Sequence, residues 1–181
     1  PSRAARLCSA LADSRNLKRL VGTGGSWFLF DVCFYANVVF SSLVLERVFG
    51  RSRGAGAKAI AGPTALTFLV ALPGYYVAVF VAERVGLRRL QIFTFVALAF
   101  VYLVAAAANA AMPPPGLFVL YALTFFIANA GPNATTFCLP AKTFPKDGRS
   151  TLSGVSAALG KLGAVVGTVS YPYVLDATQG R

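Results

Sequence analysis

Three residues with polar or ionisable side chains are spaced four apart in an otherwise apolar stretch, WFLFDVCFY. They are Trp27, Asp31 and Tyr35. On a helix, this spacing places an indole donor, a carboxylate and a phenol in one stripe about 12 Å long. Such groups can fix the orientation of a small polar ligand in a cavity. The alternative is that Trp27 belongs to an interfacial aromatic belt and Tyr35 to an ordinary core.

Two opposite charges lie deep in apolar stretches. If these stretches cross a membrane, Asp31 lies about 18 Å and Lys161 about 15 Å from the start of its span. A carboxylate near the bilayer centre costs about 2.5 to 3.5 kcal/mol, and intramembrane acids usually mark ion or substrate paths. The candidate partners of Lys161 are Asp31 and a bound anion. Asp31 could also be paired with a neighbouring helix for stability alone.

Small residues and an interrupted helix accompany these charges. Gly163 and Gly167 follow Lys161 in a GxxxG pattern that predicts close helix packing. In the segment ANAGPNATTF, Pro132 has no amide hydrogen to donate, so a bend is expected there. Asn129 and Asn133 are four apart and place two amides on one face of that bend. Asn133 could face a cavity or form a hydrogen bond between helices.

The elements that position these residues are predicted to be membrane helices. The chain has 181 residues, of which 56% are hydrophobic and 13% charged, with a mean hydropathy of +0.65. Its net charge is +11, but the basic residues lie between apolar segments, so no nucleic acid is expected as a partner. A membrane helix needs about 20 apolar residues. The predicted spans are residues 20–44, 62–82, 90–111, 116–140 and 152–175.

The expected organisation is a cytoplasmic linker at 1–19, a transmembrane bundle at 20–175 and the start of a loop at 176–181. With this topology, eleven of the 17 basic residues lie on the N-terminal side of the membrane and five on the other. The excess favours a cytoplasmic N-terminal side. The chain begins with Pro1 and its one methionine is Met112, so we expect a fragment of a longer protein.

Several chemistries are not expected. The chain has no histidine, which removes Ser/His and Cys/His nucleophile pairs and histidine metal sites. Its three cysteines, Cys8, Cys33 and Cys138, lack the CxxC spacing of a zinc site. The sequence therefore predicts neither an enzyme nor a metal or cofactor site.

Four segments carry a resemblance to a known family: GTGGSWFLFDVCFY, LPGYYVAVFVAERVG, YALTFFIANAGPNATTFCLPAKTFP and RSTLSGVSAALGKLGAVVG. They resemble the C-terminal half of the plant and fungal inorganic phosphate:proton symporters of the major facilitator superfamily, and GPNATTF is the most specific element. The resemblance implies an all-α membrane protein. Its five transmembrane helices would correspond to helices seven to eleven of twelve, with the last helix and the first half missing.

The resemblance also implies a phosphate site. The family's phosphate-contacting residues of helix seven match Trp27, Asp31 and Tyr35, its helix-ten asparagine matches Asn133, and its helix-eleven lysine matches Lys161. A carboxylate beside an anion is repulsive unless one of the two carries a proton. Asp31 is therefore expected to couple phosphate to a proton, so that each stabilises the other.

The implied function is import of inorganic phosphate with protons by alternating access. The expected partners are phosphate, protons, the lipid bilayer and the missing N-terminal half of the same transporter, and the expected location is the plasma membrane. The alternatives are a major facilitator transporter of a sugar or organic anion, and a non-transporting phosphate sensor on the same scaffold.

Overall fold

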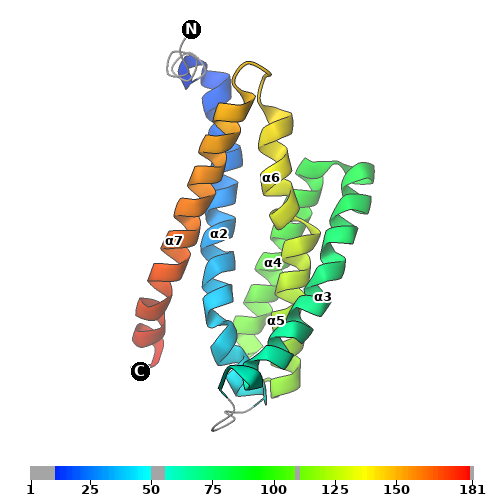
Figure 1. Ribbon diagram of the computed structural model, residues 1–181, viewed down its shortest axis with the longest axis vertical. Coiled ribbons are helices and arrows are strands. Elements are labelled where there is room, and N and C mark those ends of the chain that lie inside the picture. Colours follow the sequence, from blue (N-terminus) through cyan, green and yellow to red (C-terminus); the bar gives the residue numbers. More distant parts are fainter. Residues whose placement is uncertain (1–10, 50–55, 109–110, 180–181) are drawn as a thin grey trace. The chain divides into compact units, whose positions relative to one another are not determined.

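The computed structural model describes residues 11–49, 56–108 and 111–179, which form helices joined by short turns. The helices are α2 (Ser14–Phe49), α3 (Gly56–Val85), α4 (Leu87–Ala108), α5 (Pro114–Ala130), α6 (Pro132–Thr143) and α7 (Arg149–Gln179) (Figure 1). The described residues leave out 1–10 of the predicted linker, 50–55 between the first two predicted spans, 109–110 of the predicted span 90–111 and 180–181 of the predicted final loop.

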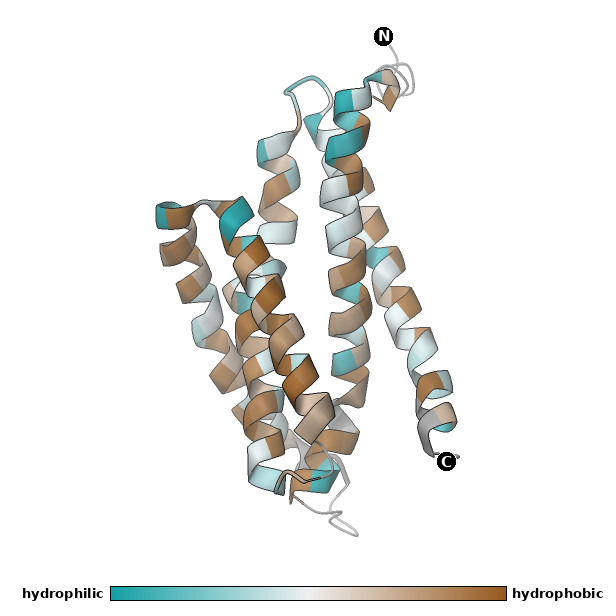
Figure 2. Ribbon diagram, turned by 180° about the vertical axis from the view of Figure 1, so that it is seen from behind, coloured by the Kyte–Doolittle hydropathy of each residue, from teal (hydrophilic) through white to brown (hydrophobic). Residues whose placement is uncertain are grey.

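Four helical segments among the described residues are long and apolar enough to cross a membrane. They are Ala61–Val85, Leu87–Ala108, Pro114–Thr143 and Arg149–Val174. A fifth qualifies if Ser14–Ser41 and Leu43–Phe49 are taken together as one bent span. Hydrophobic residues predominate along the helices (Figure 2). The prediction of an all-α membrane protein is confirmed, and the described residues contain four to five candidate spans.

The outward faces of α3 and α4 are strongly apolar. Phe68, Phe80, Phe93, Phe100 and Leu103 are among the exposed large side chains of these helices. Exposed apolar surface of this extent is unfavourable in water and typical of a surface that contacts lipid or protein.

The structure shifts the helix bounds relative to the predicted spans. Helix α2 begins at Ser14, within the predicted linker, and the predicted span at 116–140 is divided between α5 and α6. Gly131 separates these two helices with φ −148° and ψ −87°. Pro132 is the first residue of α6, a position where its missing N–H leaves no helical hydrogen bond unmade. The predicted bend at Pro132 is therefore a break between two helices.

The chain divides into two compact units. The first unit comprises Pro1–Val39 and Thr136–Arg181, and the second comprises Phe40–Thr135. The first unit contains most of α2, the end of α6 and all of α7. The second contains the end of α2 with α3, α4, α5 and the start of α6.

The first unit has a small apolar core at the N-terminal end of α2. Leu20, Phe144 and Leu152 are buried together, with Leu11 and Val155 packed against them. This core joins α2 to the turn between α6 and α7. It therefore fixes the relative heights at which α2 and α7 begin.

The second unit is built mainly on α5. Its buried residues include Leu117, Tyr121 and Phe125, and α3 contributes Ala71 and Ala78. Small side chains on α3 let the two helices approach closely. A methyl group at Gly74 would lie 2.9 Å from Asn129 Cβ and 3.0 Å from the backbone nitrogen of Ala130.

Candidate functional site

Helices α2 and α7 run side by side in the first unit, and glycines on α7 allow the contact (Figure 1). A methyl group at Gly163 would overlap the carbonyl oxygen of Phe28, and one at Gly167 would overlap that of Val32. The contacts advance in the same direction along both helices, so the helices are parallel. The close packing predicted from the GxxxG pattern is confirmed.

The indole of Trp27 packs on a third glycine of α7. A side chain at Gly160 would overlap the indole ring. Trp27 also makes an edge-to-face contact with Phe137, with the ring centroids 6.3 Å apart. These contacts hold the indole one helical turn from Asp31.

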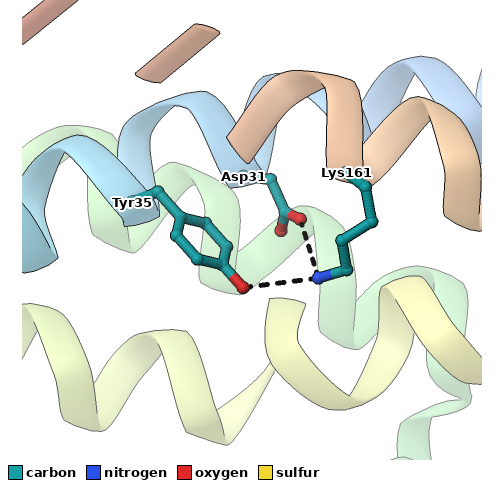
Figure 3. Close-up of polar contacts among 3 residues, drawn as sticks. All are labelled: Asp31, Tyr35 and Lys161. Carbon is teal, nitrogen blue, oxygen red and sulfur yellow. Dashed lines mark hydrogen bonds and ion pairs between the residues drawn. The ribbon is translucent and has the colours of Figure 1, made fainter. Parts of the chain in front are cut away.

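Asp31, Tyr35 and Lys161 meet where α2 and α7 face each other (Figure 3). Lys161 Nζ lies 3.7 Å from Asp31 Oδ2 and donates a 3.3 Å hydrogen bond to Tyr35 Oη. The same ammonium lies 5.3 Å from the centroid of the Tyr35 ring, within range of a cation–π interaction. The structure therefore pairs Lys161 with Asp31, one of its two candidate partners.

The two charges differ sharply in their exposure. The Asp31 side chain is 5% exposed, whereas that of Lys161 is 65% exposed. Asp31 Oδ2 has no hydrogen-bond partner in the described part of the chain, because 3.7 Å is an ion pair rather than a hydrogen bond. The ammonium has three N–H donors. The pair therefore retains a buried acceptor that could take a proton and an open cation that could bind an anion.

Buried hydroxyl groups support this arrangement a few turns away. Thr23 Oγ1 and Ser156 Oγ lie 3.0 Å apart across α2 and α7. Each hydroxyl also lies within hydrogen-bond distance of a carbonyl oxygen on its own helix, Thr23 of Arg19 at 2.9 Å and Ser156 of Leu152 at 3.1 Å, so either hydroxyl can donate the bond between them. Together with the glycine contacts, this bond fixes the register of the two helices and hence the height of Lys161 relative to Asp31.

Asn133 lies in the second unit, in a chain of amide hydrogen bonds. Asn133 Nδ2 donates to Asn129 Oδ1 at 2.7 Å, and Asn129 Nδ2 donates to the carbonyl oxygen of Ala71 at 3.1 Å. The proposed role of Asn133 as a link between helices is thus fulfilled by its neighbour Asn129. The participation of Asn133 in a site with Asp31 and Lys161 stays a prediction.

Sequence reasoning missed two partners of the predicted residues. It did not identify Gly160 as the surface on which Trp27 packs, or Ala71 as the acceptor for Asn129. The signal for the second was the Pro73-Gly74 pair inside an apolar span, since glycine in such a helix often marks a close backbone approach.

Comparisons with known proteins give a consistent result. The sequence profile described as "Sugar (and other) transporter" matches residues 27–181. The chain is 36% identical over 163 residues to the inorganic phosphate transporter PHO84 of Saccharomyces cerevisiae, a match that covers 88% of this chain and 28% of the relative.

Two plant proteins match comparably. The probable inorganic phosphate transporter 1-9 of Oryza sativa subsp. japonica is 39% identical over 163 residues, covering 84% of this chain and 28% of the relative. The inorganic phosphate transporter 1-1 of Arabidopsis thaliana is 35% identical over 165 residues, covering 85% of this chain and 32% of the relative. The chain thus spans about 30% of the length of these relatives. Because the family profile matches most of its residues, the chain belongs to the sugar (and other) transporter family of the major facilitator superfamily.

Proposed function

We propose that this chain is part of a secondary transporter that imports inorganic phosphate together with protons by alternating access. Its helices would correspond to helices seven to eleven of twelve, and the rest of the protein would complete the substrate cavity. Membership of a transporter family supports this proposal, as do relatives named as inorganic phosphate transporters. Transport itself would be a property of the whole protein.

The observation that carries the proposal is the unequal ion pair of Asp31 and Lys161. Lys161 offers an exposed ammonium to an anion, and Tyr35 Oη lies 3.3 Å from the same ammonium. A phosphate bound there would lie close to the buried Asp31 carboxylate, and the two negative groups would repel each other. A proton on Asp31 or on the phosphate removes the repulsion. Phosphate and proton would therefore bind together, which is the thermodynamic basis of symport.

Two further residues would complete the phosphate contacts. The indole N–H of Trp27 is a donor without acceptor capacity, so it suits a phosphate oxygen. The Asn133 amide is the second proposed phosphate contact, as the resemblance to the phosphate:proton symporters implies. We propose the plasma membrane as the location, with the N-terminal side of α2 facing the cytoplasm, and rocking of the two halves of the full transporter as the mechanism of alternating access.

The test is phosphate uptake by the full-length transporter in proteoliposomes with an imposed proton gradient. Lys161→Ala is expected to lower uptake at subsaturating phosphate by about 10- to 100-fold, because a charge-assisted contact is lost. Asp31→Asn is expected to abolish accumulation driven by the proton gradient. Lys146→Ala is the matched control, because it removes an exposed lysine of the same unit far from the ion pair in sequence.

Uptake at the control level in both variants, with equal amounts of reconstituted protein, contradicts the site assignment. A sugar or an organic anion remains the alternative cargo because the family profile is named for sugar and other transporters. Uptake of a labelled sugar or organic anion that added phosphate does not inhibit would favour that alternative. Phosphate binding without uptake in the same vesicles would identify a sensor.

A further inference from the structure

The amide chain of the second unit has a direction that its chemistry fixes. A backbone carbonyl can only accept a hydrogen bond, so the group of Asn129 that faces the Ala71 carbonyl must be its NH₂. The Oδ1 of Asn129 then faces Asn133 and requires a donor, which is Asn133 Nδ2 at 2.7 Å. The orientation of the second amide therefore follows from the first.

Asn129 has little freedom to adopt another orientation. It is 9% exposed, and its Cβ lies close to Gly74 of α3, where a methyl group would be only 2.9 Å away. The next glycine along, Gly131, packs against the side chain of Thr94 of α4, so that a methyl group there would overlap it. The end of α5 is thus held on two sides, and Asn129 with it.

The other end of the Asn133 amide is available. Asn133 is half-buried, and its Oδ1 has no hydrogen-bond partner within residues 11–49, 56–108 and 111–179. The amide therefore presents an oriented acceptor, together with the second hydrogen of Nδ2.

We propose that Asn129 is a positioning residue that orients the Asn133 amide so that Asn133 Oδ1 accepts a hydrogen bond from a protonated oxygen of the transported anion. This inference rests on the proposed function, in which Asn133 contacts phosphate. An amide oxygen repels a deprotonated oxygen and attracts a P–OH group. At neutral pH every phosphate ion carries at least one hydroxyl, whereas sulfate carries none. The pair Asn129 and Asn133 thus selects phosphate and its protonated analogues over sulfate.

The experiment compares phosphate and sulfate in the full-length transporter, reconstituted in proteoliposomes at fixed pH. The readout is the ratio of the inhibition constant of sulfate to the KM of phosphate. Asn129→Leu removes both amide bonds at similar volume and frees Asn133 to rotate. We expect this ratio to fall by about tenfold, with the maximal rate changed much less, because an oriented acceptor no longer rejects sulfate.

Two variants serve as controls. In Asn129→Asp, a protonated carboxyl can donate to the Ala71 carbonyl and accept from Asn133, so the ratio should stay within about twofold of the wild-type value. Thr124→Val removes a 2.7 Å hydrogen bond to the Tyr121 carbonyl oxygen in the same helix and should leave the ratio unchanged. If Asn129→Leu fails to reach the membrane, Asn129→Ser is measured in its place.

An unchanged ratio in Asn129→Leu or Asn129→Ser overturns the inference, even if the KM and the inhibition constant rise together, because that result indicates a purely structural role. A fall of the same size in Thr124→Val also overturns it. Failure of the proposed function is separate: the wild-type transporter would then take up no phosphate at all.

Discussion

Two helix contacts have similar backbone packing but different polar side chains. One joins α2 and α7 in the first unit, and the other joins α3 and α5 in the second. In each, a glycine lies against a backbone carbonyl of the opposite helix, Gly163 against Phe28 and Gly74 against Phe126. The first contact carries the opposite charges of Asp31 and Lys161. The second carries neutral amides.

The difference shows that polar groups in apolar helices can serve either to fix the packing or to bind a ligand. The amide chain of the second unit ends on a backbone carbonyl, so the hydrogen-bonding capacity of Asn129 is directed within the protein. The ion pair of the first unit is long, at 3.7 Å, and its cation is largely exposed. An amide whose oxygen and nitrogen are both bonded within the protein, as in Asn129, fixes geometry, whereas an ion pair with unused donors can exchange one partner for a ligand.

The largest expected effect is the loss of the close approach in the first unit. Gly163→Ala places a methyl group against the Phe28 carbonyl, and since that atom is backbone, the helices must separate. We expect destabilisation of about 3 kcal/mol or more, the upper end of the range for overpacked cores, because the obstructing atom is backbone and has no alternative rotamer. The measurement is the thermal unfolding midpoint of the full-length protein in detergent.

Gly154→Ala is the matched control on the same helix, because a methyl group there meets no atom within 4 Å. It should leave the midpoint unchanged or raise it slightly, since alanine favours a helix over glycine. Equal midpoints for the two variants would mean that the glycine contact is not required.

Substitutions of the two members of the ion pair should have intermediate effects on stability, and these effects should differ. Lys161→Met leaves the buried carboxylate of Asp31 without its cation, and we expect a loss of about 1 to 3 kcal/mol. Asp31→Asn leaves an ammonium that is 65% exposed and still hydrated, so its loss should be smaller. Unfolding midpoints measured without phosphate report this order, and the reverse order would contradict the assignment of Asp31 as the desolvated partner.

The smallest effect concerns the buried hydroxyl pair. Ser156→Ala removes the 3.0 Å contact with Thr23, while the bond from Thr23 to the Arg19 carbonyl remains. Hydrogen bonds between membrane helices contribute on average about 0.6 kcal/mol, so a shift of this size is expected in the same unfolding measurement. A larger loss of stability in Ser156→Ala than in Lys161→Met would contradict the expectation that the ion pair stabilises the first unit more than the hydroxyl pair does.

Much of the first unit's chemistry could be predicted from the sequence because it depends on single charged residues within apolar runs. Asp31 and Lys161 interrupt apolar runs, and a desolvated charge strongly favours an opposite one, so each is a candidate partner of the other beside a bound anion. The bend predicted at Pro132 likewise depends on one residue, because proline lacks the amide hydrogen.

The partners in the second unit could not be predicted in the same way. The bond from Asn129 to the Ala71 carbonyl joins residues 58 positions apart. It depends on the register between α3 and α5, which many packed side chains set together. The Pro73-Gly74 pair indicates a close approach to α3, but it does not indicate which backbone carbonyl of that region accepts the hydrogen bond from Asn129.

The break between α5 and α6 has a mechanical consequence. A continuous helix transmits a twist about its axis along its whole length, because each turn is bonded to the next. At Gly131 the helix is interrupted, but the side-chain bond from Asn133 to Asn129 joins α6 to α5 across the break. A twist of α6 would therefore reach α5 through this amide pair as well as through the backbone, and the α5 member of the pair is itself bonded to the Ala71 carbonyl.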